Sequence, residues 1–144
     1  MKVKAIIYQS LQGSSKAYAK LLGSIIKIPV FSLQEAKFNV LEHSKIIYIT
    51  YLDKGKIKDY LKVKDLYDIQ ISAVCHILDT TLDEVKTNNQ VNEPLFLLAG
   101  SFDIQKIKGI QKILCKMVMK DQKIIHEISE EDIKDLIDYY YYKL

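Results

Sequence analysis

The stretch Val3–Gly23, VKAIIYQSLQGSSKAYAKLLG, decides the fold expected for this chain. It opens with an apolar, β-branched run, Val3–Tyr8, which is too short for a helix and is typical of a buried strand. After a short turn, apolar side chains recur at helical spacing, which predicts an amphipathic helix. The side chains expected to face the core are Ala17, Leu21 and Leu22, with Lys16 and Lys20 pointing outward.

The turn between this strand and helix is rich in hydroxyl groups and carries one glycine. Backbone N–H groups at a helix start have no partner inside the helix, and the helix dipole adds partial positive charge, so such a turn suits a phosphate. The simpler alternative is that one serine only caps the helix. The three-glycine dinucleotide fingerprint and the Walker phosphate loop are both absent. The residues of this turn are Ser10, Gln12, Gly13, Ser14 and Ser15.

Length and composition predict one globular domain over residues 1–144. Hydrophobic residues make up 49% of the chain and charged residues 27%, which is ordinary for a single core. No apolar run approaches the roughly 20 residues that span a bilayer. Met1-Lys-Val-Lys leads into the first strand without a cleavage site, so we expect a cytoplasmic protein.

The charge pattern narrows the chemistry further. The net charge of +3 is too small, and the lysines too dispersed, for nucleic-acid binding. All 21 basic residues are lysine, which excludes chemistry that needs a bidentate guanidinium. A bound phosphate would therefore be held by backbone amides, hydroxyl groups or lysine. Cys75 and Cys115 lie in apolar runs and are expected to be buried thiols, and the three histidines show no metal-ligand spacing.

The remainder of the chain alternates strands and helices. Lys27–Phe31 reads as a strand that Pro29 assigns to a sheet edge, and Lys45–Tyr51 as a central strand. Two more strands are expected at Ile69–Leu78, with His76 in its middle as a core residue, and at Pro94–Gly100. Helices are expected at Ile104–Met119 and after the cap Ser129–Asp132, with a single helical turn around Leu33–Ala36. Asp53–Gly55 is expected to turn the chain into a further helix, Ile57–Leu66, with Tyr60, Leu61 and Val63 inward. Asp79–Glu93 reads as a loop, either throughout or with one short helix in it.

These strands lack polar alternation, which predicts a parallel sheet covered by helices on both faces. Five strands fit a doubly wound α/β sheet of order 2-1-3-4-5. A ligand then belongs outside the carboxyl ends of the first and third strands, where the winding reverses. The turn suited to phosphate lies at that end of the first strand, so two separate arguments lead to one place.

Two segments resemble the flavodoxin-like family. Tyr8–Ala19, YQSLQGSSKAYA, is similar to the family's phosphate loop, Ser/Thr-x-x-Gly-x-Thr/Ser. Pro94–Lys120 resembles the end of short single-domain flavodoxins related to menaquinone-dependent protoporphyrinogen oxidase, with a strand, a Gly-x-x-Asp turn and a helix rich in lysine and methionine. The resemblance covers nearly the whole chain in order. It implies FMN at the point where the strand order reverses.

By this resemblance, the FMN phosphate would be bound by the turn residues Ser10, Gln12, Gly13, Ser14 and Ser15. The ring would lie between the loops that follow the third and fourth strands. Ile49 stands where the family has glycine, Asp53 where it has a stacking tyrosine, and Asp79–Leu82 holds no aromatic residue. Tyr51 is either the substitute stacking residue or a partly buried tyrosine at a strand end. The ring contacts implied are Thr50, Tyr51, Leu52, Asp53, Gly55, Asp79, Thr80 and Thr81.

The resemblance implies an FMN-binding redox protein, acting in electron transfer or as a flavin-dependent oxidoreductase. Its electron partner would be a redox protein or a quinone-like or porphyrin-like small molecule, and a homodimer is compatible with it. The net charge favours a dedicated enzyme or partner over a strongly acidic electron shuttle. The alternative is a flavin-free module of the same fold that survives as a binding or scaffold protein.

Overall fold

The computed structural model describes residues 2–103, 123–124 and 126–144. Their main feature is a parallel five-stranded sheet of order β2-β1-β3-β5-β6, which confirms the expected 2-1-3-4-5 winding. β1 and β3 lie side by side, with Ala5 opposite Ile46 and Tyr8 opposite Ile49. The strands are β1 (Ala5–Tyr8), β2 (Val30–Ser32), β3 (Lys45–Asp53), β5 (Asp68–His76) and β6 (Leu95–Ala99).

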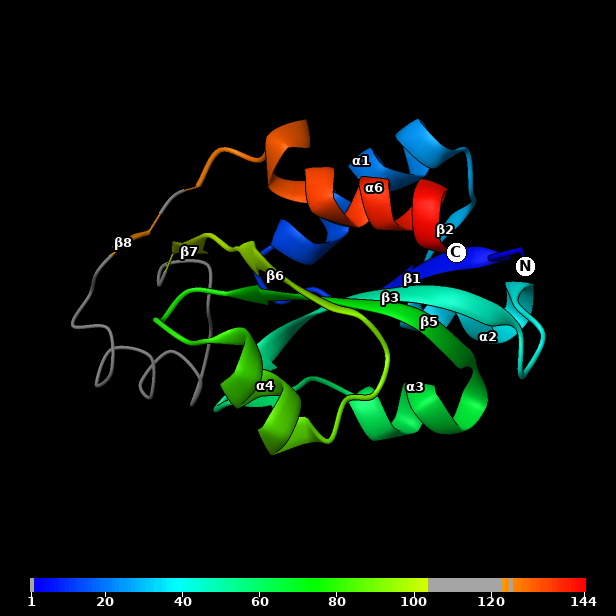
Figure 1. The fold of residues 1–144 in the computed structure, drawn as a ribbon, viewed down its shortest axis with the longest axis horizontal. Coiled ribbons are helices and arrows are strands. Elements are labelled where there is room, and N and C mark those ends of the chain that lie inside the picture. Colours follow the sequence, from blue (N-terminus) through cyan, green and yellow to red (C-terminus); the bar gives the residue numbers. More distant parts are fainter. Residues whose placement is uncertain (1, 104–122, 125) are drawn as a thin grey trace.

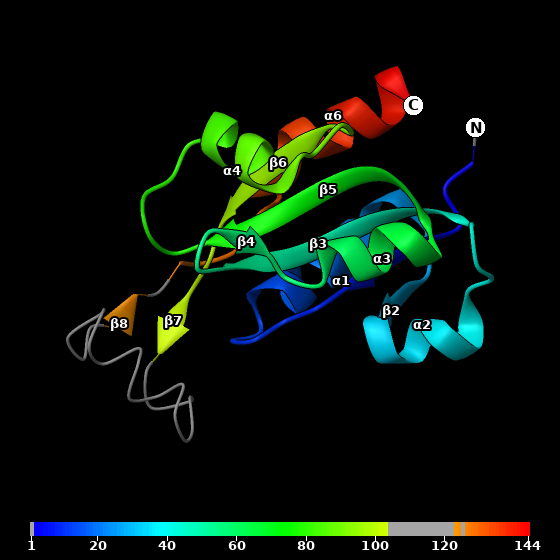
Figure 2. The same cartoon turned by 90° about the horizontal axis from the view of Figure 1, so that it is seen from below.

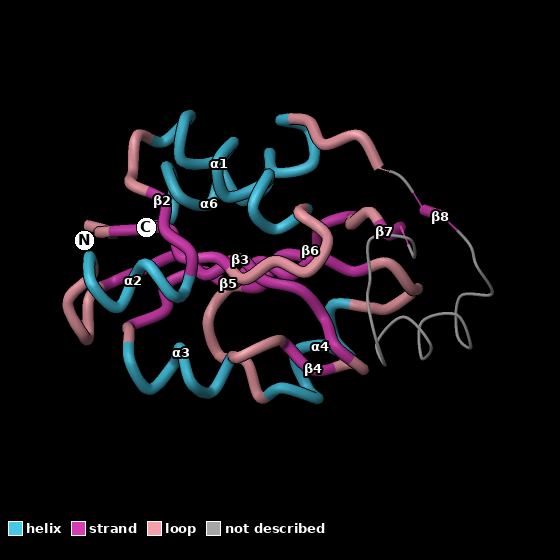
Figure 3. Tube along the Cα trace, turned by 180° about the vertical axis from the view of Figure 1, so that it is seen from behind, coloured by secondary structure: helices cyan, strands magenta, loops and turns pink. Residues whose placement is uncertain are grey.

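Helices cover both faces of the sheet, as expected (Figures 1 and 3). On one face lie α1 (Ser14–Ile26), the 3₁₀ turn η2 (Glu130–Ile133) and α6 (Lys134–Lys143). On the other lie α2 (Leu33–Asn39), α3 (Tyr60–Leu66) and α4 (Leu82–Asn89). Each face has its own apolar core, because the inner strands bury side chains in both directions.

The strand pattern follows directly from the residues. Ile46 to Ile49 of β3 are all fully buried, as a central parallel strand requires. β2 ends the sheet on one side, and the carbonyl of the preceding Pro29 accepts from the Ile6 N–H at 2.9 Å. Proline has no N–H to donate to a further strand, and at the edge of the sheet no such strand needs one. The structure therefore confirms the expected edge position.

The side of α1 that faces the core is rotated about the helix axis from the side that the sequence predicted. Ala17 is exposed and Leu21 only half-buried, so two of the three expected core positions were wrong or incomplete. Ser15 turns into the protein at the first turn, and this sets the rotation of everything after it. The buried positions then recur at helical spacing, namely Ser15, Tyr18, Ala19, Leu22 and Ile26.

A hairpin stands where the sequence predicted the start of a helix. β3 runs on to Asp53, and the short strand β4 (Lys56–Ile57) pairs back on it antiparallel. Lys54 and Gly55 between them have φ values of 54° and 80°, as in a type I′ turn. α3 therefore begins only at Tyr60. Tyr60 and Val63 are buried as expected, whereas Leu61 is 72% exposed.

Capping residues explain the starts of three further helical segments. α2 extends beyond one turn and has a capping box between Ser32 and Glu35. α4 is the short helix that the sequence left open within Asp79–Glu93, and Thr81 caps its start. Ser129 is the N-cap of the last helical segment, as expected, and its N–H and hydroxyl both donate to the Asp132 carboxylate.

Beyond the carboxyl end of the sheet, β7 (Phe102–Asp103) and β8 (Lys123–Ile124) form a separate antiparallel pair (Figure 2). The helix expected at Ile104–Met119, with Cys115, lies outside the described residues.

The contact between α1 and β2 offers a direct test of this packing. A Cβ added at Gly23 would lie 2.4 Å from Val30 Cγ2 and 3.0 Å from the Ile28 carbonyl oxygen. Gly23→Ala is therefore expected to lower the free energy of unfolding by about 1–3 kcal/mol, although alanine favours helices. Urea unfolding measures the change. The adjacent exposed Ser24→Ala is the control and should stay within about 0.5 kcal/mol of the parent; equal stability of the two variants would contradict the packing.

Candidate functional site

The turn from β1 into α1 lies at the carboxyl edge of the sheet, where the strand order reverses. The Gln9 N–H donates to the Ile49 carbonyl oxygen at 3.0 Å, which continues the β1–β3 pairing to the last residue before the turn. The Gly13 N–H donates to Ser10 Oγ at 2.9 Å and closes the turn. Gly13 has φ of +97°, a backbone conformation that side chains disfavour, and no atom lies within 4 Å of the position of a Cβ.

Ser15 lies beneath the turn and joins three elements. It is 1% exposed, and its hydroxyl donates to the Thr50 carbonyl oxygen at 2.9 Å. Its Oγ is also 3.4 Å from Sγ of Cys75 on β5. Thr50 itself is fully buried. The Ser15 hydroxyl and the Thr50 carbonyl group support the turn from below, so any role for these two residues in a ligand site is to hold the turn in place.

Ser14, the first residue of α1, has a different position. Its Oγ accepts from the Ser101 N–H at 2.9 Å, which ties the start of α1 to the segment after β6. A hydroxyl oxygen that accepts a hydrogen bond still has a hydrogen to donate. The same holds for Ser10, which accepts from Gly13. Ser10 and Ser14 are thus the hydroxyl groups at the mouth of α1 best suited to donate to an anion.

The hairpin after β3 is held against α4 and the turn after β1. The Asn89 side chain accepts from the Ile57 N–H at 2.9 Å and donates to the Gly55 carbonyl oxygen at 3.1 Å. Gln9 Nε2 donates to Asp59 Oδ2 at 2.6 Å across the end of the sheet. The backbone of this hairpin is therefore set by contacts on two sides.

The expected ring contacts on this hairpin face different surroundings. Tyr51 is half-buried and packs against the apolar core on the α1 side, and burial, then Asp53 and Asp59, raise the pKa of its hydroxyl. Leu52 packs against the core on the opposite face, while Asp53 is exposed. Of the two alternatives for Tyr51, its packing matches the partly buried tyrosine at a strand end.

The loop after β5 uses its hydroxyl groups to start α4. Thr81 Oγ1 accepts from the Glu84 N–H at 3.2 Å, and Thr80 Oγ1 donates to Glu84 Oε2 at 3.3 Å. His76 is half-buried at the end of β5, with Nδ1 3.1 Å from the Leu78 carbonyl oxygen, so its assignment to the core was wrong. β5 ends at His76, although the apolar residues Ile77 and Leu78 that follow had predicted a strand continuing to Leu78.

Exposed leucines are the apolar groups that this edge presents. Leu78 is 56% exposed and Leu82 41%, on either side of the Asp79–Thr81 segment, and Leu11 in the turn after β1 is 43% exposed. Sequence reasoning searched these loops for aromatic residues and passed over the leucines. Their position could have been read from the sequence, because each is a single apolar residue in or beside a polar loop.

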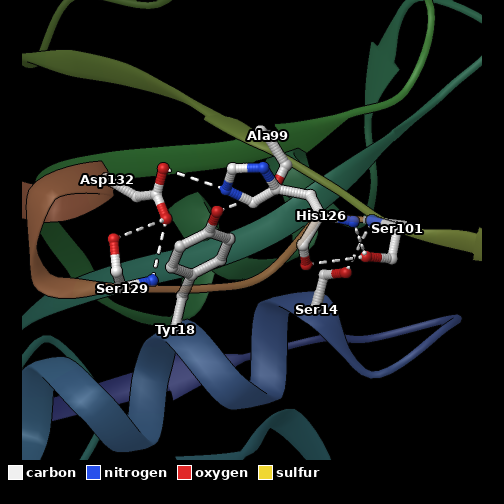
Figure 4. A network of polar contacts seen from close by, with 7 residues as sticks. All are labelled: Ser14, Tyr18, Ala99, Ser101, His126, Ser129 and Asp132. Atoms are coloured by element: carbon white, nitrogen blue, oxygen red, sulfur yellow. Dashed lines mark hydrogen bonds and ion pairs between the residues drawn. The ribbon is translucent and has the colours of Figure 1, made fainter. Parts of the chain in front are cut away.

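A second polar cluster connects α1 with η2 (Figure 4). His126 Nε2 lies 2.9 Å from Asp132 Oδ1, with side-chain exposures of 33% and 18%. Ser101 Oγ bonds both the N–H and the carbonyl oxygen of His126, at 2.9 and 3.1 Å, and its own N–H donates to Ser14. The cluster therefore reaches the start of α1 through Ser101. His126 and Asp132 are six positions apart, a spacing that carries no sequence signal.

Two pKa shifts accompany this cluster. Burial raises the pKa of the Asp132 carboxyl, but the Ser129 N–H and the His126 ring outweigh burial and hold it below its usual value. Tyr18 donates to the Ala99 carbonyl oxygen at 2.6 Å, and burial, with Asp132 second, raises the pKa of its hydroxyl. Both residues thus keep their ordinary neutral-pH charge states.

Two negative findings concern the described ranges only. Across residues 2–103, 123–124 and 126–144, no three His, Cys, Asp or Glu side chains gather as a metal site would require. Over the same ranges, none of the helices has the length and hydropathy needed to cross a bilayer.

Comparisons with protein-family models, with curated proteins and with solved structures found no match to this chain. The class that the structure defines is therefore given by its topology, a doubly wound α/β fold of flavodoxin-like strand order.

Cys75 offers a pH test of the scaffold beneath the turn. Burial raises the pKa of its thiol from 9.0 to about 12, while the Ser15 hydroxyl lowers it. Because the unfolded thiol ionises first, stability is full below about pH 9 and falls as the pH rises toward 12. The free energy of unfolding should fall by up to about 1.4 kcal/mol per pH unit in that window. Urea unfolding of the parent and of Cys75→Ala measures it: the slope should be shallower in Cys75→Ala, and equal slopes would contradict the buried thiol.

Proposed function

We propose that this protein binds FMN at the carboxyl edge of the sheet and works as a redox protein. The observation that carries the proposal is the coincidence of two features at one place. The strand order reverses between β1 and β3, and the 13-residue helix α1 begins there with the Ser10 and Ser14 hydroxyls at its mouth.

The phosphate would be held by groups of the turn that suit an anion. First-turn N–H groups of a helix lack intrahelical partners, and Ser10 and Ser14 keep hydrogens to donate. Gln12 and Gly13 complete the turn, and Ser15 supports it from below through Thr50. The chain contains no arginine, so a phosphate can be bound only by backbone N–H groups, hydroxyl groups or lysine. This turn supplies the first two.

The ring would lie over the segments that follow β3 and β5. Tyr51 packs into the core, so the apolar contacts come from Leu78 and Leu82, with Asp79, Thr80 and Thr81 between them in the chain. Aliphatic contact without aromatic stacking favours modest affinity. The nearby carboxylates Asp53 and Asp79 would disfavour a negatively charged reduced ring by like-charge repulsion.

FMN, once bound, would supply the electron or hydride transfer, and the chain would position it and exclude water. The electron partner would be a redox protein or a quinone-like or porphyrin-like molecule.

A second function, a flavin-free binding or scaffold module, is favoured by a specific observation. Several hydroxyl groups assigned to the ligand are already bonded within the protein: Ser15 to Thr50, Thr80 and Thr81 to Glu84. Such loops hold their shape without a ligand. The measured affinity for FMN decides between the two functions.

The phosphate half of the proposal is tested with Ser14→Ala and Ser10→Ala. Each removes one donor to a dianion, so the affinity for FMN should fall about 10-fold or more, while the affinity for riboflavin, which lacks the phosphate, should change less than about twofold. Quenching of flavin fluorescence measures both. The exposed Ser24→Ala, on the same helix, is the control. Equal losses for both ligands would contradict the phosphate assignment, and no binding of FMN at micromolar concentration would favour the flavin-free module.

The ring half is tested with Leu78→Ser. Removing apolar contact with the ring should weaken FMN and riboflavin by the same factor, about fivefold, since the ring is common to both. Leu61→Ser, which changes another exposed leucine, 72% exposed on α3 against 56% for Leu78, is the control. A loss confined to FMN, or no loss, would contradict ring contact at Leu78.

A further inference from the structure

Two large apolar side chains at the end of α2 are the most exposed ones within the described ranges. Phe38 is 89% exposed and Leu41 84%. Phe38 is the second-to-last residue of α2, and Leu41 opens the turn that leads into β3. Single exposed apolar residues are ordinary on a protein surface, whereas neighbouring ones that are almost wholly exposed indicate an interaction surface.

The turn that carries Leu41 is held in place by backbone hydrogen bonds. The Ser44 N–H donates to the Leu41 carbonyl oxygen at 3.2 Å and closes the turn. The His43 N–H donates to the Leu66 carbonyl oxygen at 2.7 Å, and the Ser44 carbonyl oxygen accepts from the Asp68 N–H at 2.9 Å. The turn is thus bonded to the junction of α3 and β5, and a fixed backbone presents Leu41 to solvent.

The half of the molecule around this turn is basic. Residues 2–45, which form β1, α1, β2 and α2, contain seven lysines and two acidic residues, whereas the other described residues contain nine lysines and fifteen acidic residues. Six of the seven lysines are exposed, and in the described part of the chain none of the seven forms an ion pair. These lysines are Lys2, Lys4, Lys16, Lys20, Lys27, Lys37 and Lys45.

Three of these lysines lie beside the apolar pair. Lys37 precedes Phe38 in α2, and Lys45 follows the turn as the first residue of β3. The Lys4 N–H donates to the Lys45 carbonyl oxygen at 2.8 Å, which places the amino-terminal segment next to the turn. Figures 1 and 2 both show the amino terminus and α2 at the same end of the molecule. We call Lys4, Lys37, Phe38, Leu41 and Lys45 the basic corner.

The acidic residues of neighbouring elements leave this end of the molecule positive. The end of α3 adds one lysine and one aspartate, and the last turns of α6, which reach the end of α1 through Tyr141, add another of each. Asp68 lies opposite Lys45 in the β3–β5 register. With these included, nine lysines stand against five acidic residues. The added lysines are Lys64 and Lys143, and the acidic residues are Glu35, Glu42, Asp65, Asp68 and Asp138.

We propose that the basic corner binds the surface of a bilayer that contains anionic lipids. Phe38 and Leu41 would enter the headgroup region, and the lysines around them would lie along the lipid phosphates, with their long stems reaching the polar layer. The corner joins the two things that such a surface offers, negative charge and an apolar layer beneath it. It lies at the amino edge of the sheet, opposite the edge assigned to FMN, so the proposal stands without FMN.

The test is co-sedimentation of the full chain, without added FMN, with vesicles of phosphatidylcholine alone or with about 30% phosphatidylglycerol. The protein should bind the anionic vesicles and stay in solution with the neutral ones. Raising the salt from about 50 to about 500 mM should release most of the bound protein, because the lysines are exposed to screening.

Matched variants locate the contact. Leu41→Ser and Phe38→Ser should each lower the partition coefficient about fivefold, whereas Leu61→Ser, at a leucine 72% exposed on α3, should change it less than about twofold. Lys37→Gln should lower it about threefold to fivefold, and Lys134→Gln, at the opposite end of α6 from Lys143, less than about twofold.

Equal binding to neutral vesicles, no binding to anionic ones, or equal losses in Leu41→Ser and Leu61→Ser would each overturn the proposal. A soluble polyanion, poly-glutamate, separates a membrane from an acidic protein. If it competes fully with the vesicles, and Phe38→Ser and Leu41→Ser bind as the parent does, charge alone carries the contact. The corner then fits an acidic protein, and the membrane proposal fails.

Discussion

The hydrogen bond from the buried Ser15 hydroxyl to the Thr50 carbonyl oxygen is the contact on which the carboxyl edge of the sheet depends. It joins the first turn of α1 to the end of β3, with Cys75 of β5 beside it. A buried hydroxyl without a partner is costly, so this bond selects one rotation of the helix. That rotation seats Tyr18, Leu22 and Ile26 in the core and places Ser14, which is 9% exposed, against Ser101 at the start of the helix.

The carboxyl edge is held by bonds between loops that are distant in sequence. Ser14 accepts from Ser101, Ser101 pairs with the backbone of His126, and the His126 ring meets Asp132 at the start of η2 (Figure 4). On the other side, Gln9 meets Asp59, and Asn89 holds the hairpin after β3. The segments after β1, β3 and β6 are thus each bonded to another segment of the chain, which gives a preorganised surface around the mouth of α1.

Apolar patterning predicted the layers well and the loops poorly. The parallel order, the edge position at Pro29 and the cap at Ser129 follow from local chemistry, and the structure confirms them. The sequence predicted a turn at Asp53–Gly55 but not the returning strand β4, because Ile57 reads equally well as the start of a helix or as part of a strand. His126 and Asp132 were missed because their contact depends on the path of the chain, which spacing does not encode.

The sequence by itself determined the α/β class, the winding of the sheet and the place of a turn suited to an anion, because hydrophobic period and strand burial act locally. Only the tertiary structure decided which partner each hydroxyl group of that turn bonds. Ser15 and Ser14 are adjacent and chemically identical, yet Ser15 donates to the Thr50 carbonyl oxygen, whereas Ser14 accepts from the Ser101 N–H. The physical reason is that burial and hydrogen-bond partners arise from distant strands, whose approach no local pattern can specify.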